Sequence, residues 1–114
     1  MIRRFILASA IAGLVAAPAM AAEPIEGSWK RDNGTVIKYA ANGGAFCGTV
    51  MTGEYKGQSI GCMKGSGANY KGKVNKLDEG KTYTGKASVN GNSMKLSGCV
   101  LGGVICKSET LKRQ

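Results

Sequence analysis

The sequence contains no histidine and only seven acidic residues, against sixteen basic ones. Without histidine, neither a Ser-His-Asp nor a Cys-His catalytic centre can exist. The only acids that are adjacent in the sequence are Asp78 and Glu79, on a predicted turn tip. Neighbouring side chains on an extended chain point to opposite sides, so this pair does not predict converging acid and base groups. The sequence therefore predicts a protein that is not an enzyme.

Metal and cofactor motifs are also missing. The four cysteines are separated by 15, 37 and 7 positions, so no C-x-x-C pair indicates a zinc site or a redox-active thiol. No P-loop or dinucleotide-binding glycine motif is present, and the glycines read as turn residues. We expect no metal and no cofactor.

Positive charge is abundant but not clustered. Twelve of the basic residues are lysines, and no block of five like charges occurs. A nucleic-acid interface would cluster its charge and combine arginine with aromatic residues, so we expect no nucleic-acid partner. The charge either keeps the protein soluble or attracts it to anionic polymers of the cell envelope, such as lipopolysaccharide.

The N-terminus has the layout of a secretory signal peptide. Arg3 and Arg4 precede an apolar run over 5–17 and a small-x-small cleavage site that ends at Ala21. Thirteen apolar residues are too short to cross a bilayer core of about 30 Å. The first cysteine is Cys47, so no lipid attachment is expected after cleavage. We predict a bacterial protein that is periplasmic or secreted and has no membrane span.

Cleavage would leave residues 22–114 as a single all-β domain of 93 residues with a formal charge of +7. A chain of this size buries a marginal core. Small secreted domains often compensate with disulfides, and an even number of cysteines fits that expectation.

Short strands between turn signals dominate this domain. No helical periodicity is present after the leader, and pairs such as Asn90-Gly91 mark hairpin turns. The predicted strands cover residues 27–31, 35–40, 45–51, 69–75, 81–89, 93–101 and 104–112. This spacing favours a small antiparallel β-barrel or sandwich of about seven strands.

The inner face of these strands can be read from their alternation. Small inner residues such as Gly85 and Gly98 either allow a tightly curved sheet or leave room for a ligand. Trp29, the only tryptophan, is expected to anchor the core. In the last strand the alternation places Lys107 and Glu109 inside, so we expect a bulge or a frayed edge there.

The cysteines are expected to form two disulfides. With Gly102-Gly103 as a two-residue turn, Cys99 and Cys106 lie opposite each other at a distance that a disulfide can span. Cys47 and Cys62 then remain as the second pair. This is the favoured one of the three pairings that four cysteines allow.

Residues 52–68 are rich in glycine and show no sustained alternation, so they predict the longest irregular segment. Such a segment is either a solvated loop or a binding surface. If a binding surface exists, we expect it here and at the start of the next strand. The candidate binding residues are Tyr55, Lys56, Lys64, Ser66, Tyr70 and Lys71.

Several short motifs make the chain resemble the bacterial domain-of-unknown-function family 2147. They are Gly27 and Trp29, Cys47-Gly48, Gly80-Lys81-Thr82-Tyr83, Gly98-Cys99, and Thr110 with Arg113. The chain has Asn75-Lys76 where the family often has aspartate-proline, and Leu111 where it often has tryptophan. The resemblance implies a small secreted β-barrel-like domain and no established activity.

A shorter motif, Ser66-Gly67-Ala68-Asn69-Tyr70, is similar to the S-G-x-x-Y pattern of periplasmic lysozyme inhibitors, which are also small disulfide-bonded barrels. Lysozymes are usually basic, so a basic partner would be repelled at long range. We therefore expect a non-enzymatic, monomeric β-barrel binding protein. Its partner would be an anionic envelope polymer or, in a lipocalin-like manner, a small ligand. Inhibition of a lysozyme-like enzyme is the alternative.

Overall fold

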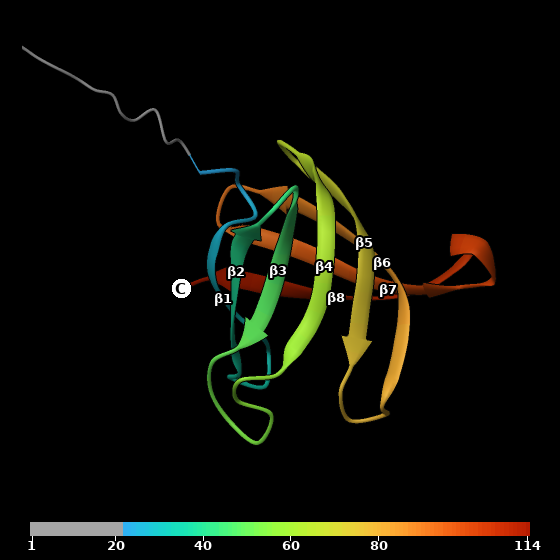
Figure 1. Ribbon diagram of the computed structural model, residues 1–114, viewed down its shortest axis with the longest axis horizontal. Coiled ribbons are helices and arrows are strands. Elements are labelled where there is room, and N and C mark those ends of the chain that lie inside the picture. The colour runs from blue at the N-terminus through green and yellow to red at the C-terminus, as the bar shows by residue number, and fades with distance from the viewer. Residues whose placement is uncertain (1–21) are drawn as a thin grey trace, which may run out of the picture.

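The computed structural model describes residues 22–114, and the predicted signal peptide lies outside the described residues. Eight antiparallel strands form a closed barrel in which each strand pairs with the next and the last pairs with the first (Figure 1). The strands are β1 (Gly27–Lys30), β2 (Val36–Asn42), β3 (Ala45–Val50), β4 (Ser59–Ser66), β5 (Asn69–Lys76), β6 (Lys81–Asn90), β7 (Ser93–Val100) and β8 (Ile105–Arg113). The predicted all-β, disulfide-bonded fold is confirmed: of the two predicted architectures it is the barrel, with eight strands where about seven were expected.

This up-and-down order sends successive connections to alternate ends of the barrel. One end, which we call the rim, carries the loops 31–35, 51–58, 77–80 and 101–104. The other end, which we call the base, carries the turns 43–44, 67–68 and 91–92 together with the N-terminal segment 22–26. The rim is therefore covered by loops alone, whereas the N-terminal segment 22–26 also covers the base.

The base is closed by packing around Trp29, which is fully buried. Its indole N–H donates a hydrogen bond of 2.9 Å to the carbonyl of Ile25. The guanidinium of Arg113 lies 4.1 Å from the centre of the Trp29 ring. Arg113 also donates to the carbonyls of Glu26 and Pro24, at 3.0 and 2.7 Å. The expectation that Trp29 anchors the core is confirmed.

The barrel closes along a short seam between β1 and β8. Only two residue pairs are in register there, Trp29 with Arg113 and Lys30 with Lys112. Beyond them, toward the rim, Arg31 donates two hydrogen bonds to the carboxylate of Glu109, at 2.9 and 3.0 Å. Arg113 toward the base and Arg31 toward the rim therefore both stabilise the contact between β1 and β8.

The irregular segment predicted over 52–68 is wrong in its second half. The structure keeps only 51–58 as a loop and continues into β4. A register shift between β3 and β4 buries two consecutive residues, Ile60 and Gly61. This bulge interrupts the alternation of buried and exposed residues, so the sequence pattern does not reveal the strand.

The bulge or frayed edge predicted in the last strand is also wrong. β8 pairs with β7 in unbroken register from Ile105 to Lys112. The alternation is therefore kept, and Lys107 and Glu109 belong to the inner face. They are tolerated because the barrel is not filled with apolar side chains near the rim.

Both predicted disulfides are present. Cys47 is bonded to Cys62 across β3 and β4, and Cys99 to Cys106 across β7 and β8. The turn behind the second bridge differs from the prediction. It contains four residues, 101–104, of which the first three form a short 3₁₀ turn labelled η2 (Leu101–Gly103), instead of a two-residue glycine turn.

Candidate functional site

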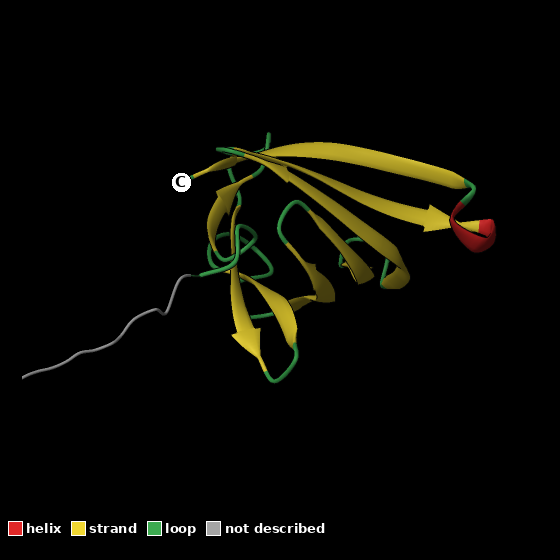
Figure 2. Ribbon diagram, turned by 90° about the horizontal axis from the view of Figure 1, so that it is seen from above, coloured by secondary structure: helices red, strands yellow, loops and turns green. Residues whose placement is uncertain are grey.

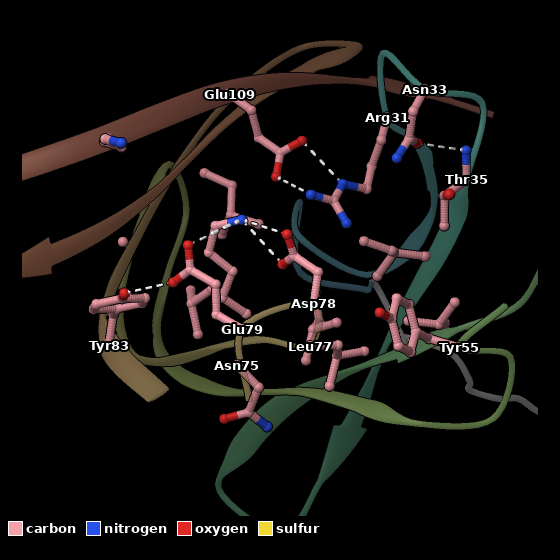
Figure 3. A pocket seen from close by; sticks show the side chains of 18 of the residues that line it. Arg31, Asn33, Thr35, Tyr55, Asn75, Leu77, Asp78, Glu79, Tyr83 and Glu109 are labelled. Carbon is pink, nitrogen blue, oxygen red and sulfur yellow. Dashed lines mark hydrogen bonds and ion pairs between the residues drawn. The ribbon is translucent and has the colours of Figure 1, made fainter. Parts of the chain in front are cut away.

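A cavity of about 730 Å³ lies inside the barrel and opens at the rim (Figure 3). Its size is typical of a site for a small organic ligand. Much of its wall is apolar and comes from the inner faces of the strands and from two rim loops. The apolar and aromatic lining residues are Ile37, Val50, Tyr55, Ile60, Val74, Leu77, Tyr83, Leu96, Val100 and Ile105.

The inner glycines explain where this space begins. A Cβ added at Gly85 would meet Val74 Cγ2 at 2.7 Å and Met63 Cε at 2.8 Å, so this glycine lets the wall pack tightly. A Cβ added at Gly98 would meet nothing closer than 3.5 Å, from the Cβ of Tyr83. Gly98 also lines the cavity. The two explanations left open for the small inner residues therefore both apply, one at Gly85 and the other at Gly98, which pair directly across β6 and β7.

One ion pair crosses the cavity wall at the seam. Arg31 comes from the end of the first strand and Glu109 from β8, and each side chain is about one-third exposed, 34% and 33%. Their two parallel hydrogen bonds give the bidentate geometry that orders both side chains. In Figure 3 this pair lies across the cavity from Asn75.

A second polar network covers the loop between β5 and β6. Lys76 Nζ lies 3.0 Å from both carboxylate oxygens of Asp78 and 3.7 Å from Glu79 Oε2. The hydroxyl of Tyr83 donates a hydrogen bond of 2.7 Å to Glu79 Oε1. The hydrogen bond between Lys76 and Asp78 raises the pKa of the lysine and lowers the pKa of the carboxyl. The hydrogen bond to Glu79 raises the pKa of Tyr83.

A buried tyrosine lies next to the cavity wall. Among the described residues, the hydroxyl of Tyr39 has no hydrogen-bond partner, and the side chain is 1% exposed. The ring packs where a Cβ on Gly48 would stand, at 2.9 Å from Tyr39 Cζ. Burial is the main cause that raises the pKa of Tyr39, and the charge of Glu109 adds to it while Arg31 opposes it.

The predicted binding residues do not form one surface. Tyr55 and Lys56 lie on the rim loop 51–58, where Tyr55 is half-buried and lines the cavity and Lys56 is exposed. The rest lie along β4 and β5 toward the base. Those with exposed side chains are Lys64, Ser66 and Lys71.

Tyr70 lies in the core instead of on the surface. It is 2% exposed, and its ring meets that of Phe46 edge-on, with 5.8 Å between the ring centres. The motif that resembles lysozyme inhibitors is a tight turn between β4 and β5, in which Ser66 pairs with Asn69. The N–H of Gly67 in this turn donates to Glu23 at 2.9 Å. The structure therefore leaves the aromatic residue of the motif without exposed surface.

The polar residues of the cavity were missed as site residues, although part of the signal was visible. Alternation placed Lys107 and Glu109 inside, and this was interpreted as a defect of the strand. Asp78 and Glu79 were correctly placed on a turn. Nothing in the sequence pattern brings that turn together with Lys76 and Tyr83 at a cavity mouth.

Within residues 22–114, no group of three or more His, Cys, Asp or Glu side chains could hold a metal ion. The same part of the chain has no helix with the length and apolar character needed to cross a membrane.

Comparison with family models gives a match over residues 56–113 to DUF2147, described as an uncharacterized protein conserved in bacteria. The matched segment is 58 of the 114 residues and runs from the rim loop before β4 to the end of β8. It contains both the Lys76 network and Glu109, whereas Trp29 and Arg31 precede it. No curated protein and no solved structure matches the chain.

Proposed function

The chain belongs to the bacterial family DUF2147, and from this starting point we propose that it is a non-enzymatic binding protein of the periplasm or the extracellular space that holds a small amphiphilic molecule in its rim cavity. The observation that carries the proposal is the cavity itself, about 730 Å³, closed below by the packed base and open at the rim. Apolar walls with a few polar groups at the mouth are the usual composition of small-ligand sites.

The charges at the mouth define the polar end of the ligand. The lining contains the cations Arg31, Lys76 and Lys107 and the acids Glu54, Asp78, Glu79 and Glu109. The mouth is therefore close to neutral, although residues 22–114 carry a formal charge of +7. A ligand with an uncharged or zwitterionic polar end fits this mouth better than an anionic polymer. Anionic envelope polymers would fit the lysines on the outer face of the barrel.

The acids at the mouth favour binding over catalysis. A general acid needs a raised pKa, which arises when a carboxyl is buried without a cation. Here Lys76 lowers the pKa of Asp78, and Glu109 is paired with Arg31. Carboxylates that are paired with cations in this way can orient a polar group of a ligand.

The wall around the cavity is suited to binding without large rearrangement. The bridge between Cys47 and Cys62 joins the two strands on either side of the rim loop 51–58, and the other joins the two strands that carry Gly98 and Glu109. A wall that is held in place loses less conformational freedom when a ligand enters.

The proposal is tested by filling the cavity. Gly98 has no positive φ and has space beside it, so Gly98→Phe should fold and occupy the ligand site. The matched control is Thr84→Phe, which adds the same side chain to the outer face of β6. Binding is measured with N-phenyl-1-naphthylamine, an uncharged amphiphile whose fluorescence rises in apolar surroundings.

The parent protein and Thr84→Phe should bind the probe saturably with one site, and Gly98→Phe should bind it at least about tenfold more weakly, which corresponds to about 1.4 kcal/mol. A melting curve for each variant shows that it is folded. Absence of saturable binding to the parent, or equal binding by folded Gly98→Phe, would overturn the proposal.

A further inference from the structure

The hairpin between β7 and β8 carries an exposed apolar tip, of which Leu101 and Val104 do not line the cavity. Figure 2 shows this hairpin extending beyond the rest of the barrel, with η2 at its far end. The tip comprises residues 100–105. Its large apolar side chains are Val100, Leu101, Val104 and Ile105, with exposed fractions of 41, 72, 81 and 54%. Among the described residues, the one other exposed large apolar side chain is Met51, with an exposed fraction of 40%.

The backbone of the tip indicates that these side chains are not incidental. Leu101 has φ +53°, the left-handed conformation that a large side chain rarely adopts, and Gly102 and Gly103 follow with φ +69° and +93°. Asparagine or glycine would adopt this conformation at lower cost. Leu101 gains little packing in return, because 72% of it is exposed. A costly conformation at an exposed apolar residue is the kind of outlier that points to a functional surface.

The tip is also flanked by positive charge. Residues 97–107 contain no acid. A Cβ on Gly103 would lie 3.7 Å from Lys86 Nζ, so this ammonium stands beside the turn. Lys107 follows the disulfide, and the first acid beyond it, Glu109, is already paired with Arg31. The turn thus has the Lys86 ammonium beside it, and a second lysine, Lys107, lies two residues beyond the end of the tip in the sequence.

We propose that the tip of residues 100–105 docks on the surface of an anionic lipid bilayer. Leu101 and Val104 would enter the boundary between headgroups and acyl chains, while Lys86 and Lys107 contact lipid phosphates. Apolar side chains combined with adjacent lysines are what anionic interfaces attract. The chain lies on the membrane in this arrangement and does not span it.

The shape of the tip favours a bilayer over a second protein. A stable protein interface buries about 800 Å² on each partner, which is far more than the end of a two-stranded hairpin offers. A fluid interface can close around a narrow projection from all sides. The disulfide between Cys99 and Cys106, directly behind the turn, keeps the projection from spreading open when it meets the headgroups.

The test compares the binding of the full protein to vesicles of phosphatidylcholine with and without phosphatidylglycerol, measured by flotation. The variant is Leu101→Asp, because aspartate tolerates the left-handed conformation and position 101 does not line the cavity. The matched control is Met51→Asp, which makes the same change of charge and polarity at the other exposed apolar residue.

The parent should bind the vesicles that contain phosphatidylglycerol, and added salt should weaken this binding. Leu101→Asp should lower the binding at least about tenfold, and Met51→Asp less than about twofold. Lys86→Gln, which does not change a residue that lines the cavity, should weaken binding and reduce its dependence on salt. The melting curve and the absence of free thiols establish that each variant retains its fold.

Three results would overturn the inference. The first is that the parent does not bind anionic vesicles. The second is that Met51→Asp weakens binding as much as Leu101→Asp, because the effect would then come from net charge and not from the tip. In the third, sedimentation shows a dimer that Leu101→Asp dissociates while vesicle binding is unchanged, so that a second copy of the chain covers the tip. Probe binding in solution is measured on Leu101→Asp as well, because it should be unchanged and so separates a failure of the tip from a failure of the cavity.

Discussion

Replacement of Trp29 by alanine tests whether the closed base of the barrel depends on this one side chain. Trp29 is fully buried, and its indole N–H donates a hydrogen bond to the carbonyl of Ile25. The guanidinium of Arg113 lies over its ring, 4.1 Å from the ring centre. Truncation of a buried tryptophan to alanine costs about 3–5 kcal/mol. The loss of a donor for Ile25 and of the ring under Arg113 places the cost in the upper part of that range.

This cost is large compared with the stability of the whole domain. At about 0.05–0.15 kcal/mol per residue, the 93 residues 22–114 would have a free energy of unfolding of about 5–14 kcal/mol. Urea denaturation followed by far-ultraviolet circular dichroism is the appropriate assay, since the variant has no tryptophan fluorescence. With a slope of about 1–3 kcal/mol/M, the midpoint should fall by at least about 1 M.

Trp29→Phe separates packing from hydrogen bonding. It keeps a ring for Arg113 and loses the indole N–H, so it should cost about 1–2 kcal/mol. Thr84→Ala, on the exposed outer face, should change the free energy of unfolding by no more than about 0.5 kcal/mol. If Trp29→Ala is as stable as this surface variant, the base is not held by Trp29 and the reasoning is wrong.

Two further predictions concern the bridges and the buried tyrosine. Removal of the Cys99–Cys106 bridge by double serine substitution should lower the free energy of unfolding by about 2.4 kcal/mol, and removal of the Cys47–Cys62 bridge should lower it by about 3 kcal/mol. The second value is larger because that bridge closes a longer loop. Urea denaturation measures both values, and equal stability with and without a bridge would contradict them. Tyr39 has a pKa of 10.0 in the unfolded chain, and burial raises its pKa in the folded protein. The stability that neutral Tyr39 contributes is therefore complete below pH 10 and is lost as the pH rises toward the folded pKa. Tyr39→Phe should therefore weaken the alkaline loss of stability and cost almost nothing at neutral pH, because it removes a buried hydroxyl without a partner; a large loss at neutral pH would show that the hydroxyl has a partner after all.

The fold was predictable where the two-residue period is intact and hidden where it is broken. The strands around Asn90-Gly91 were placed almost to the residue, since apolar and polar side chains alternate there. β4 was missed because consecutive burial of Ile60 and Gly61 breaks the same rule. The disulfide partners were predictable since each pair is local, within 15 residues.

The polar mouth was not predictable by the same local reasoning. Arg31 and Glu109 are 78 residues apart and meet only because the last strand pairs with the first. Nothing in the pattern of either segment shows that the sheet closes. The Lys76 network is local in sequence, but its position over a cavity follows from the closure too.

The inner face of β8 shows why the charged residues Lys107 and Glu109 can point into the barrel. Its inner residues from base to rim are Leu111, Glu109, Lys107 and Ile105. Leu111 is fully buried, Glu109 is partly buried and paired, and Lys107 and Ile105 are exposed. Inner side chains that face a filled core are mostly apolar, because burying a polar or charged group without a partner is costly. An inner face that is buried and apolar at Leu111 but charged at Glu109 and Lys107 requires a core near the base and water or a ligand above it, because burying an unpaired charge is costly. The charged inner positions of the last strand are therefore consistent with the cavity that Lys107 and Glu109 line in this barrel.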